Sequence, residues 1–136
     1  MKRFAILSIL ILIFRISFAQ ETVQISNVIL KELDNNLLSI TVEIQNVSDK
    51  SISEIAGYID IYDNSERVVE KKQLNIVHVY EVPMEPGSTR SRKAIIIQRP
   101  NMSGTARFRI THLRFFGEKE EYIICPYCGE LILKGE

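Results

Sequence analysis

The sequence predicts an antiparallel β-sandwich of seven or eight strands. Apolar and polar residues alternate along several short segments, and turn-forming residues separate those segments. No segment shows a helical repeat with capping residues at both ends. A small closed barrel built from the same strands is the alternative architecture.

The clearest strands are residues 38–44 and 55–62, where apolar side chains fall on one face and polar side chains on the other. Turn-forming residues follow each of them, at 45–51 and at 63–66. Further strands are expected at residues 23–33, 67–74, 76–82, 88–98, 105–116 and 122–124.

Two of these strands are expected to be irregular. In residues 105–116 the apolar positions change from even to odd numbers near Thr111 and His112. One extra residue in a strand exchanges its two faces, so we expect a bulge or a bend there. The strand at residues 23–33 is expected in one piece or in two pieces broken at Ser26 and Asn27.

The first nineteen residues have the pattern of a cleavable secretory signal peptide. A basic start precedes an apolar run at residues 4–14, and Ser17-Phe18-Ala19 forms a small-x-small cleavage site. The run is shorter than the roughly 20 apolar residues that span a bilayer, although an uncleaved anchor is the alternative. We expect a secreted or periplasmic protein with a signal peptide at residues 1–19, a sandwich at 20–124 and a C-terminal Cys-x-x-Cys tail at 125–136.

The composition bounds the function classes. The 136 residues are 46% hydrophobic and 25% charged, which fits one globular domain. The 17 basic and 17 acidic residues balance, so the chain has no overall bias toward nucleic acid. Two cysteines exclude a disulfide-dense mini-protein, and two histidines leave little room for a metal-dependent active site.

Three short motifs resemble the FxLYD-type domains of secreted bacterial proteins. They are Asn-Val-Ser-Asp-Lys-Ser-Ile at residues 46–52, Ile-Asp-Ile-Tyr-Asp at 59–63 and Met-Glu-Pro-Gly-Ser at 84–88. Ile59 stands where the family usually has Phe, and Glu66-Arg67 stands where a Gly is common. The resemblance implies an immunoglobulin-like sandwich without a known catalytic site.

Basic residues are concentrated in residues 86–117, which hold seven of them and no acidic residue. Arg90 and Arg92 share one face of an expected strand, and Arg107 and Arg109 share one face of the next. If these strands pair, the four arginines form a basic stripe that can bind phosphate, sulfate or carboxylate groups. The expected partners are lipid head groups or other anionic envelope components, or an acidic protein. Nucleic acid is not expected, because no aromatic side chains interleave with the arginines.

The alternative is that these basic residues form ordinary cross-strand ion pairs. Acidic residues on the polar faces of the other strands offer the partners, namely Glu43, Asp60, Glu66 and Glu70.

The C-terminal motif Cys125-Pro-Tyr-Cys128-Gly allows three interpretations. It resembles half of a zinc ribbon, and zinc needs four ligands, which a second copy of the chain or His78 and His112 would complete. It also has the spelling of a glutaredoxin motif, with Cys125 as attacking thiolate and Cys128 as resolving thiol. The third interpretation is a local disulfide, or an idle pair, in an oxidising compartment.

Asn46 and Asn101 each begin an Asn-x-Ser motif, which reads either as a glycosylation acceptor or as a turn asparagine. No catalytic triad or phosphate-binding loop is evident. The sequence therefore favours a secreted, non-enzymatic binding or assembly module that acts through an edge strand, the basic stripe or the cysteine tail, with no cofactor unless zinc. The alternative is a small thiol–disulfide oxidoreductase.

Overall fold

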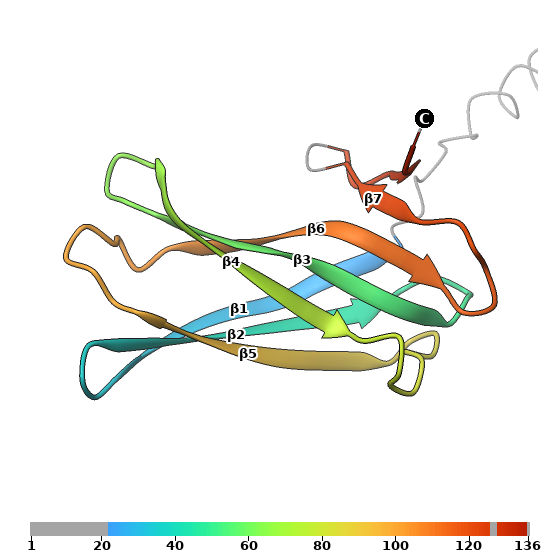
Figure 1. Cartoon of the computed structure of the whole chain (residues 1–136), viewed down its shortest axis with the longest axis horizontal. Helices are drawn as coiled ribbons and strands as arrows, with labels where there is room; N and C mark the ends of the chain where they lie inside the picture. The colour runs from blue at the N-terminus through green and yellow to red at the C-terminus, as the bar shows by residue number, and fades with distance from the viewer. Residues whose placement is uncertain (1–21, 126–127, 136) are drawn as a thin grey trace, which may run out of the picture.

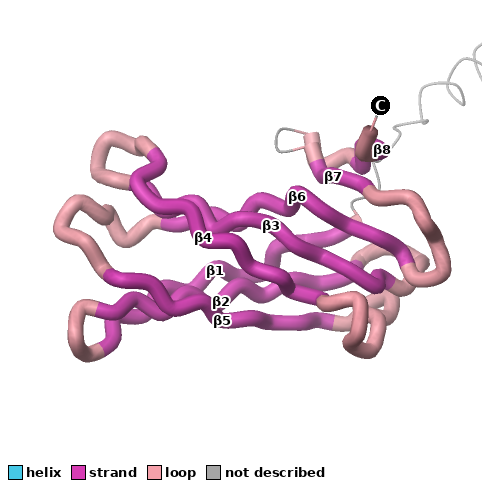
Figure 2. The backbone as a smooth tube through the Cα atoms, viewed as in Figure 1, coloured by secondary structure: helices cyan, strands magenta, loops and turns pink. Residues whose placement is uncertain are grey.

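The computed structural model describes residues 22–125 and 128–135, and this part of the chain folds into strands and turns without a helix (Figure 2). The expected signal peptide lies outside the described residues. The eight strands are β1 (Val23–Leu33), β2 (Leu37–Asn46), β3 (Ile52–Tyr62), β4 (Val68–Val77), β5 (Thr89–Ile97), β6 (Ala106–Phe115), β7 (Tyr122–Ile124) and β8 (Leu131–Leu133).

The strands form two antiparallel sheets that face each other (Figure 1). One sheet has the order β1-β2-β5 and the other the order β4-β3-β6-β7-β8. The first seven strands follow the immunoglobulin-like arrangement in which strands A, B and E face strands C′, C, F and G. The predicted sandwich is therefore confirmed.

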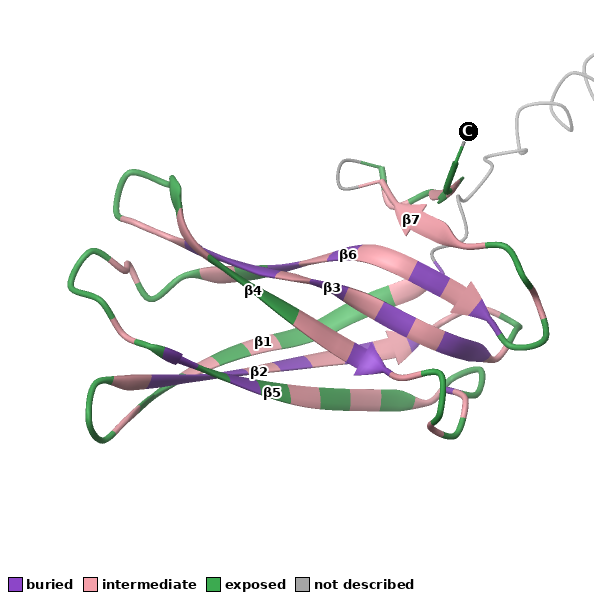
Figure 3. Cartoon of the chain, in the orientation of Figure 1, coloured by how far each residue is buried: buried purple, intermediate pink, exposed green. Residues whose placement is uncertain are grey.

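The core lies between the central strands β2 and β3, and β6 contributes to it as well (Figure 3). Alternate residues of β2 point inward, and most of the buried side chains there and on β3 are isoleucine or valine. Such β-branched side chains suit extended backbone, and each buried one stabilises the fold by about 1.5–3 kcal/mol. The fully buried members on these two strands are Ile40, Val42, Ile44, Ile52, Ile55, Ile59 and Ile61.

Both expected irregularities are β-bulges. On β6 the register passes from His112 opposite Ala56 to Ile110 opposite Gly57, so Thr111 is the extra residue and the predicted bulge is confirmed. On β1 the register shifts between Ile25 and Asn27. The strand at residues 23–33 is therefore continuous, because a bulge absorbs the change of face without a break.

The prediction of a separate strand at residues 76–82 is wrong. β4 continues through Val77, and the chain then turns, with the Glu81 amide donating to the His78 carbonyl at 3.0 Å. The apolar residues that suggested a strand are instead exposed in this loop: Val79 at 61%, Tyr80 at 80% and Val82 at 76%. We call residues 78–82 the apolar loop.

The C-terminal tail contains a strand that the sequence did not predict. β8 pairs with β7 from Tyr122 opposite Leu133 to Ile124 opposite Leu131. Leu131 also packs against the core. The tail therefore extends the five-stranded sheet, and we call β7 and β8 together the tail hairpin.

Asn46 holds two turns together. Its fully buried side-chain amide donates to the Lys50 carbonyl at 2.8 Å and to the Met84 carbonyl at 2.9 Å. Its side-chain oxygen accepts the Ser48 amide at 3.0 Å. The interpretation of Asn46 as a turn asparagine is confirmed, since a buried and fully bonded amide cannot carry a glycan. Asn101 lies in the exposed turn between β5 and β6.

Candidate functional site

The four arginines of the expected basic stripe do not lie on one face. Arg90 and Arg92 are on β5 in the three-stranded sheet, whereas Arg107 and Arg109 are on β6 in the five-stranded sheet. The expectation of a single stripe is wrong, because β5 and β6 belong to different sheets and do not pair with each other. Each pair of arginines must therefore be considered by itself.

Arg90 and Arg92 hold the apolar loop against β5. The Arg92 guanidinium pairs with the Glu81 carboxylate and also donates to the Ile76 carbonyl at 3.0 Å. Arg90 donates to the Val82 carbonyl at 3.0 Å and lies 3.8 Å from Glu81. The His78 amide, followed by Arg92, holds the pKa of Glu81 below its ordinary value. These arginines are thus engaged in stabilising a loop.

Arg107 and Arg109 lie on the outer face of the five-stranded sheet beside the polar face of β3. Arg109 pairs with the buried Asp60 through Nε and Nη2, at 3.2 and 3.4 Å. Each guanidinium also lies on an aromatic ring, Arg109 on Tyr58 at 5.7 Å and Arg107 on Tyr62 at 5.5 Å. Arg107 is exposed and has no carboxylate within ion-pair distance among the described residues.

The cross-strand ion pairs expected as the alternative form in part. Asp60 pairs with Arg109, and Glu70 pairs with Arg99 at 3.4 Å. Within the described residues, Glu43 and Glu66 form no such pair with the basic residues between 86 and 117. Of the four arginines of the expected site, Arg107 is the one that is exposed and has no ion pair within the described part of the chain.

A second set of ion pairs fixes the tail hairpin to the sheet. Arg114 on β6 bridges Glu54 at 3.0 Å and Glu121 at 2.5 Å. His112 lies between the same two carboxylates, at 3.3 and 3.5 Å, and Lys134 approaches Glu121 at 3.6 Å. The hydrogen bond from Arg114 and the nearby positive charges hold the pKa of Glu121 below its ordinary value.

The two cysteines lie in the loop of the tail hairpin, with their sulfur atoms at disulfide distance and their Cα atoms 5.5 Å apart. The Cys128 amide donates to the Cys125 sulfur at 3.2 Å. Within the described residues no group of three or more potential metal ligands is present. Zinc at the two cysteines, completed by His78 and His112 or by a second copy of the chain, stays a prediction.

A cavity of about 770 Å³ brings two of the predicted sites together. It lies between the start of β1, the first half of β6 and the tail hairpin, and we call it the tail cavity. Its lining residues are Val23, Gln24, Ile25, Asp60, Tyr62, Arg107, Phe108, Arg109, Ile110, Ile124, Cys125 and Gly129.

The tail cavity combines residues that the sequence assigns to separate sites with residues that the sequence does not single out. Arg107, Arg109 and Cys125 were candidates from the sequence, but as members of separate sites. Tyr62 and the start of β1 were not candidates. The stacking of Tyr62 under Arg107 depends on the pairing of β3 with β6, and no local pattern announces that pairing.

The fold and site define an all-β sandwich with a cysteine-paired tail hairpin and an arginine-bearing cavity beneath it. No family model and no curated protein matches the chain. The chain is similar to a solved structure described as the structural characterization of IrmA from Escherichia coli. The TM-score is 0.47 and the sequence identity is 9%, over 82% of this chain and 80% of that chain. The resemblance to FxLYD-type domains stays a prediction.

The described part of the chain contains no long apolar helix of the kind that could span a membrane.

Proposed function

We propose that the protein is a secreted, non-enzymatic binding module whose tail cavity takes an apolar ligand that carries one anionic group. The observation that carries this proposal is the guanidinium of Arg107, which lines the tail cavity and has no ion-pair partner among the described residues. Guanidinium is a planar donor suited to carboxylate, sulfate and phosphate. The Tyr62 ring beneath it restricts its position, so less side-chain freedom is lost on binding.

The rest of the lining favours a ligand with an apolar body. Val23, Ile25, Phe108, Ile110 and Ile124 contribute side chains from three parts of the fold. Polar and apolar surface line the tail cavity in nearly equal parts, which suits a ligand with both an anionic group and an apolar body. Asp60 adds no net repulsion, because Arg109 neutralises it.

Secretion is supported by the cysteine pair and by the basic and apolar start of the chain. Sulfur atoms at disulfide distance are compatible with an oxidising compartment. In that setting the pair closes the loop of the tail hairpin, which forms one wall of the tail cavity.

Anilinonaphthalene sulfonate tests the proposal, because it combines an apolar ring system with one anionic group and fluoresces when bound. We expect saturable binding that weakens about fivefold or more in Arg107→Gln, in line with the loss of one charge-assisted hydrogen bond. Lys31→Gln is the matched control. Lys31 is exposed on β1, and its replacement removes the same charge at a position away from the tail cavity. Equal affinity of both variants and the unchanged protein would contradict the proposal.

A second set of binding experiments distinguishes a small apolar anion from an anionic surface as the ligand. Heparin and vesicles containing anionic lipid present the same charged groups without a separate apolar body. Binding of anilinonaphthalene sulfonate without binding of heparin assigns the tail cavity to small apolar anions. Binding of heparin or vesicles that depends on Arg107 assigns it to an anionic surface instead.

One observation favours the alternative function, a thiol–disulfide oxidoreductase. The amide of Cys128 donates to the Cys125 sulfur, and such a bond stabilises a thiolate once the pair is reduced. An insulin reduction assay with dithiothreitol measures the activity. Loss of the activity in Cys125→Ser would support an oxidoreductase, and unchanged turnover would exclude Cys125 as its nucleophile.

A further inference from the structure

β5 is an edge strand whose outer side has no partner strand among the described residues. The even-numbered residues that flank β5 bond to the β2 side, since the Gln98 amide donates to the Asn36 carbonyl at 2.7 Å and the Ser88 carbonyl accepts from the Asn46 amide at 2.9 Å. Bonding alternates along an antiparallel pair, so the main-chain groups of odd-numbered residues point away from β2. Ile95 and Ile97 are therefore free to pair with an added strand.

The free end of β5 is also apolar. Ile95 is 52% exposed and Ile97 is 69% exposed, while Ile96 between them points into the sandwich and is buried. Isoleucine strongly favours extended backbone, and an exposed apolar edge is a template for pairing with another chain. The edge would therefore gain both hydrogen bonds and apolar contact from an added strand.

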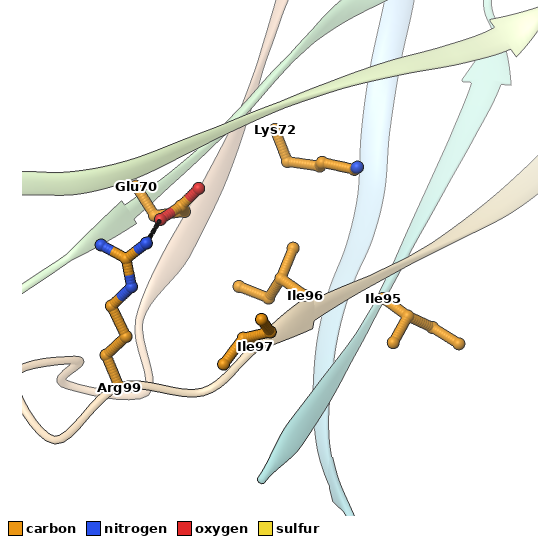
Figure 4. Close-up of a pocket in the computed structure, with 6 residues that line it drawn as sticks. All are labelled: Glu70, Lys72, Ile95, Ile96, Ile97 and Arg99. Atoms are coloured by element: carbon orange, nitrogen blue, oxygen red, sulfur yellow. Dashed lines mark ion pairs between the residues drawn. The ribbon is translucent and has the colours of Figure 1, made fainter.

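A pocket of about 250 Å³ opens between this end of β5 and the edge of β4, and we call it the edge pocket. Figure 4 shows Ile96 pointing from β5 toward β4, with Glu70 and Lys72 opposite it, and Arg99 spanning the gap to Glu70. A strand added to β5 would direct alternate side chains into the edge pocket and the others toward Ile95 and Ile97.

The charge around the edge pocket selects the chemistry of that strand. Lys72 stands opposite the buried Ile59 in the sheet register, so it lies on the inward face of β4. It has no carboxylate within ion-pair distance among the described residues, whereas Arg99 is paired with Glu70. An inward lysine discourages apolar and basic strands from adding to the edge. A strand that brings a carboxylate removes this obstacle.

We propose that β5 accepts an extended segment of a partner protein in which acidic and aliphatic residues alternate. Its main chain pairs with Ile95 and Ile97, its acidic side chains enter the edge pocket toward Lys72, and its aliphatic side chains cover the two exposed isoleucines. This is recognition by strand addition, in which main-chain bonds give affinity and alternate side chains give specificity. The site is separate from the tail cavity and does not depend on it.

A fluorescein-labelled peptide that alternates valine with glutamate is the probe, and fluorescence anisotropy is the measurement. We expect saturable binding to the full chain, about fivefold weaker for Lys72→Gln, in keeping with one exposed ion pair. Lys71→Gln is the matched control, because Lys71 is the exposed neighbour on the opposite face of β4 and should leave binding unchanged. A peptide that alternates valine with lysine should not bind.

Amide hydrogen exchange separates strand addition from electrostatic adsorption. Bound peptide should slow exchange of the Ile95 and Ile97 amides, whereas the amide of Ile96 is already bonded to β2. Ile97→Pro removes one outward donor at the end of an edge strand, where proline is tolerated, and should weaken binding. Ile97→Thr keeps the donor and the branched side chain, and should bind better than Ile97→Pro.

Several results would overturn the proposal. One is an absence of binding, and another is equal binding of the glutamate and lysine peptides. A third is binding without slower exchange at Ile95 and Ile97. Slower exchange at these amides in the protein alone, together with dimer formation, would assign the edge to a second copy of the chain.

Discussion

Arg90-Ser-Arg92 and Arg107-Phe-Arg109 have the same spacing in sequence and opposite roles in the fold. The first pair points toward the space between the sheets and holds the apolar loop through Glu81. The second pair lies on an outer face, where Asp60 engages Arg109 while Arg107 meets solvent above a tyrosine ring. The first pair is structural, and the second leaves Arg107 without an ion pair among the described residues, so that its charge is available to the proposed ligand.

The comparison teaches that alternation tells which residues share a face but not which face it is. β5 has buried residues at Ala94 and Ile96, so Arg90 and Arg92 continue its inward face toward the end of the sandwich. β6 has buried residues at Phe108 and Ile110, so its arginines fall on the outer face. Arginine reaches the rim of a core through its long apolar stem, and an inward position therefore remains possible.

Replacing Gly57 with alanine should cause the largest loss of stability. It should also disturb the outward arginine pair and not the inward one. A Cβ at Gly57 would lie 2.2 Å from the Arg109 carbonyl oxygen, so β3 and β6 would have to separate at the bulge. We expect a loss of about 3 kcal/mol or more in the free energy of unfolding, measured by chemical denaturation. The Arg109–Asp60 pair should loosen as well.

Gly104→Ala gives the comparison for Gly57→Ala. Gly104 has a positive φ of 81° but no atom within 4 Å of the added Cβ, so only backbone strain opposes the alanine. We expect a loss of about 1 kcal/mol there. If Gly104→Ala proved as destabilising as Gly57→Ala, close strand contact would not be the reason for glycine at position 57.

Removing one arginine from each pair should give a clear difference in stability. We expect Arg92→Gln to cost about 1–2 kcal/mol, because Glu81 and the Ile76 carbonyl both lose a charged donor. Arg107→Gln should change stability by less than about 0.5 kcal/mol, because Arg107 is exposed and pairs with no described carboxylate. Thermal unfolding of both variants measures this, and equal losses would remove the distinction between the pairs.

Local chemistry made much of the fold predictable from the sequence. Alternating apolar residues identify β2, β3 and β6, a change of parity locates the bulge near Thr111, and a turn asparagine is one of the two interpretations of Asn46. These features depend on neighbours along the chain. The apolar loop was mistaken for a strand because its backbone is turned by Glu81 and by arginines from β5, which are distant in sequence.

The candidate site was less predictable for the same physical reason. Arg107 was a candidate, but its partner ring on Tyr62 and the cavity around it come from strand pairing and from the tail hairpin. β8 has only three residues and is stabilised by β7 and by the packing of Leu131. A segment that short carries too little pattern to be recognised alone.

The smallest expected effect is the pH dependence of the inward pair. The pKa of Glu81 in the folded protein lies below its ordinary value of 4.5. As the pH falls, the carboxylate therefore takes up a proton more readily in the unfolded chain than in the folded one. The stability that Glu81 contributes is therefore present above pH 4.5 and is lost as pH falls through its lowered pKa. Thermal unfolding between neutral and acidic pH should show a shallower acid decline for Glu81→Gln than for the unchanged protein.

Glu85→Gln is the control, because Glu85 is exposed and forms no ion pair among the described residues. If Glu81→Gln and Glu85→Gln declined equally with acid, the contacts of the Glu81 carboxylate with the His78 amide and with Arg92 would not stabilise the apolar loop, and the distinction between the two arginine pairs would rest on position alone.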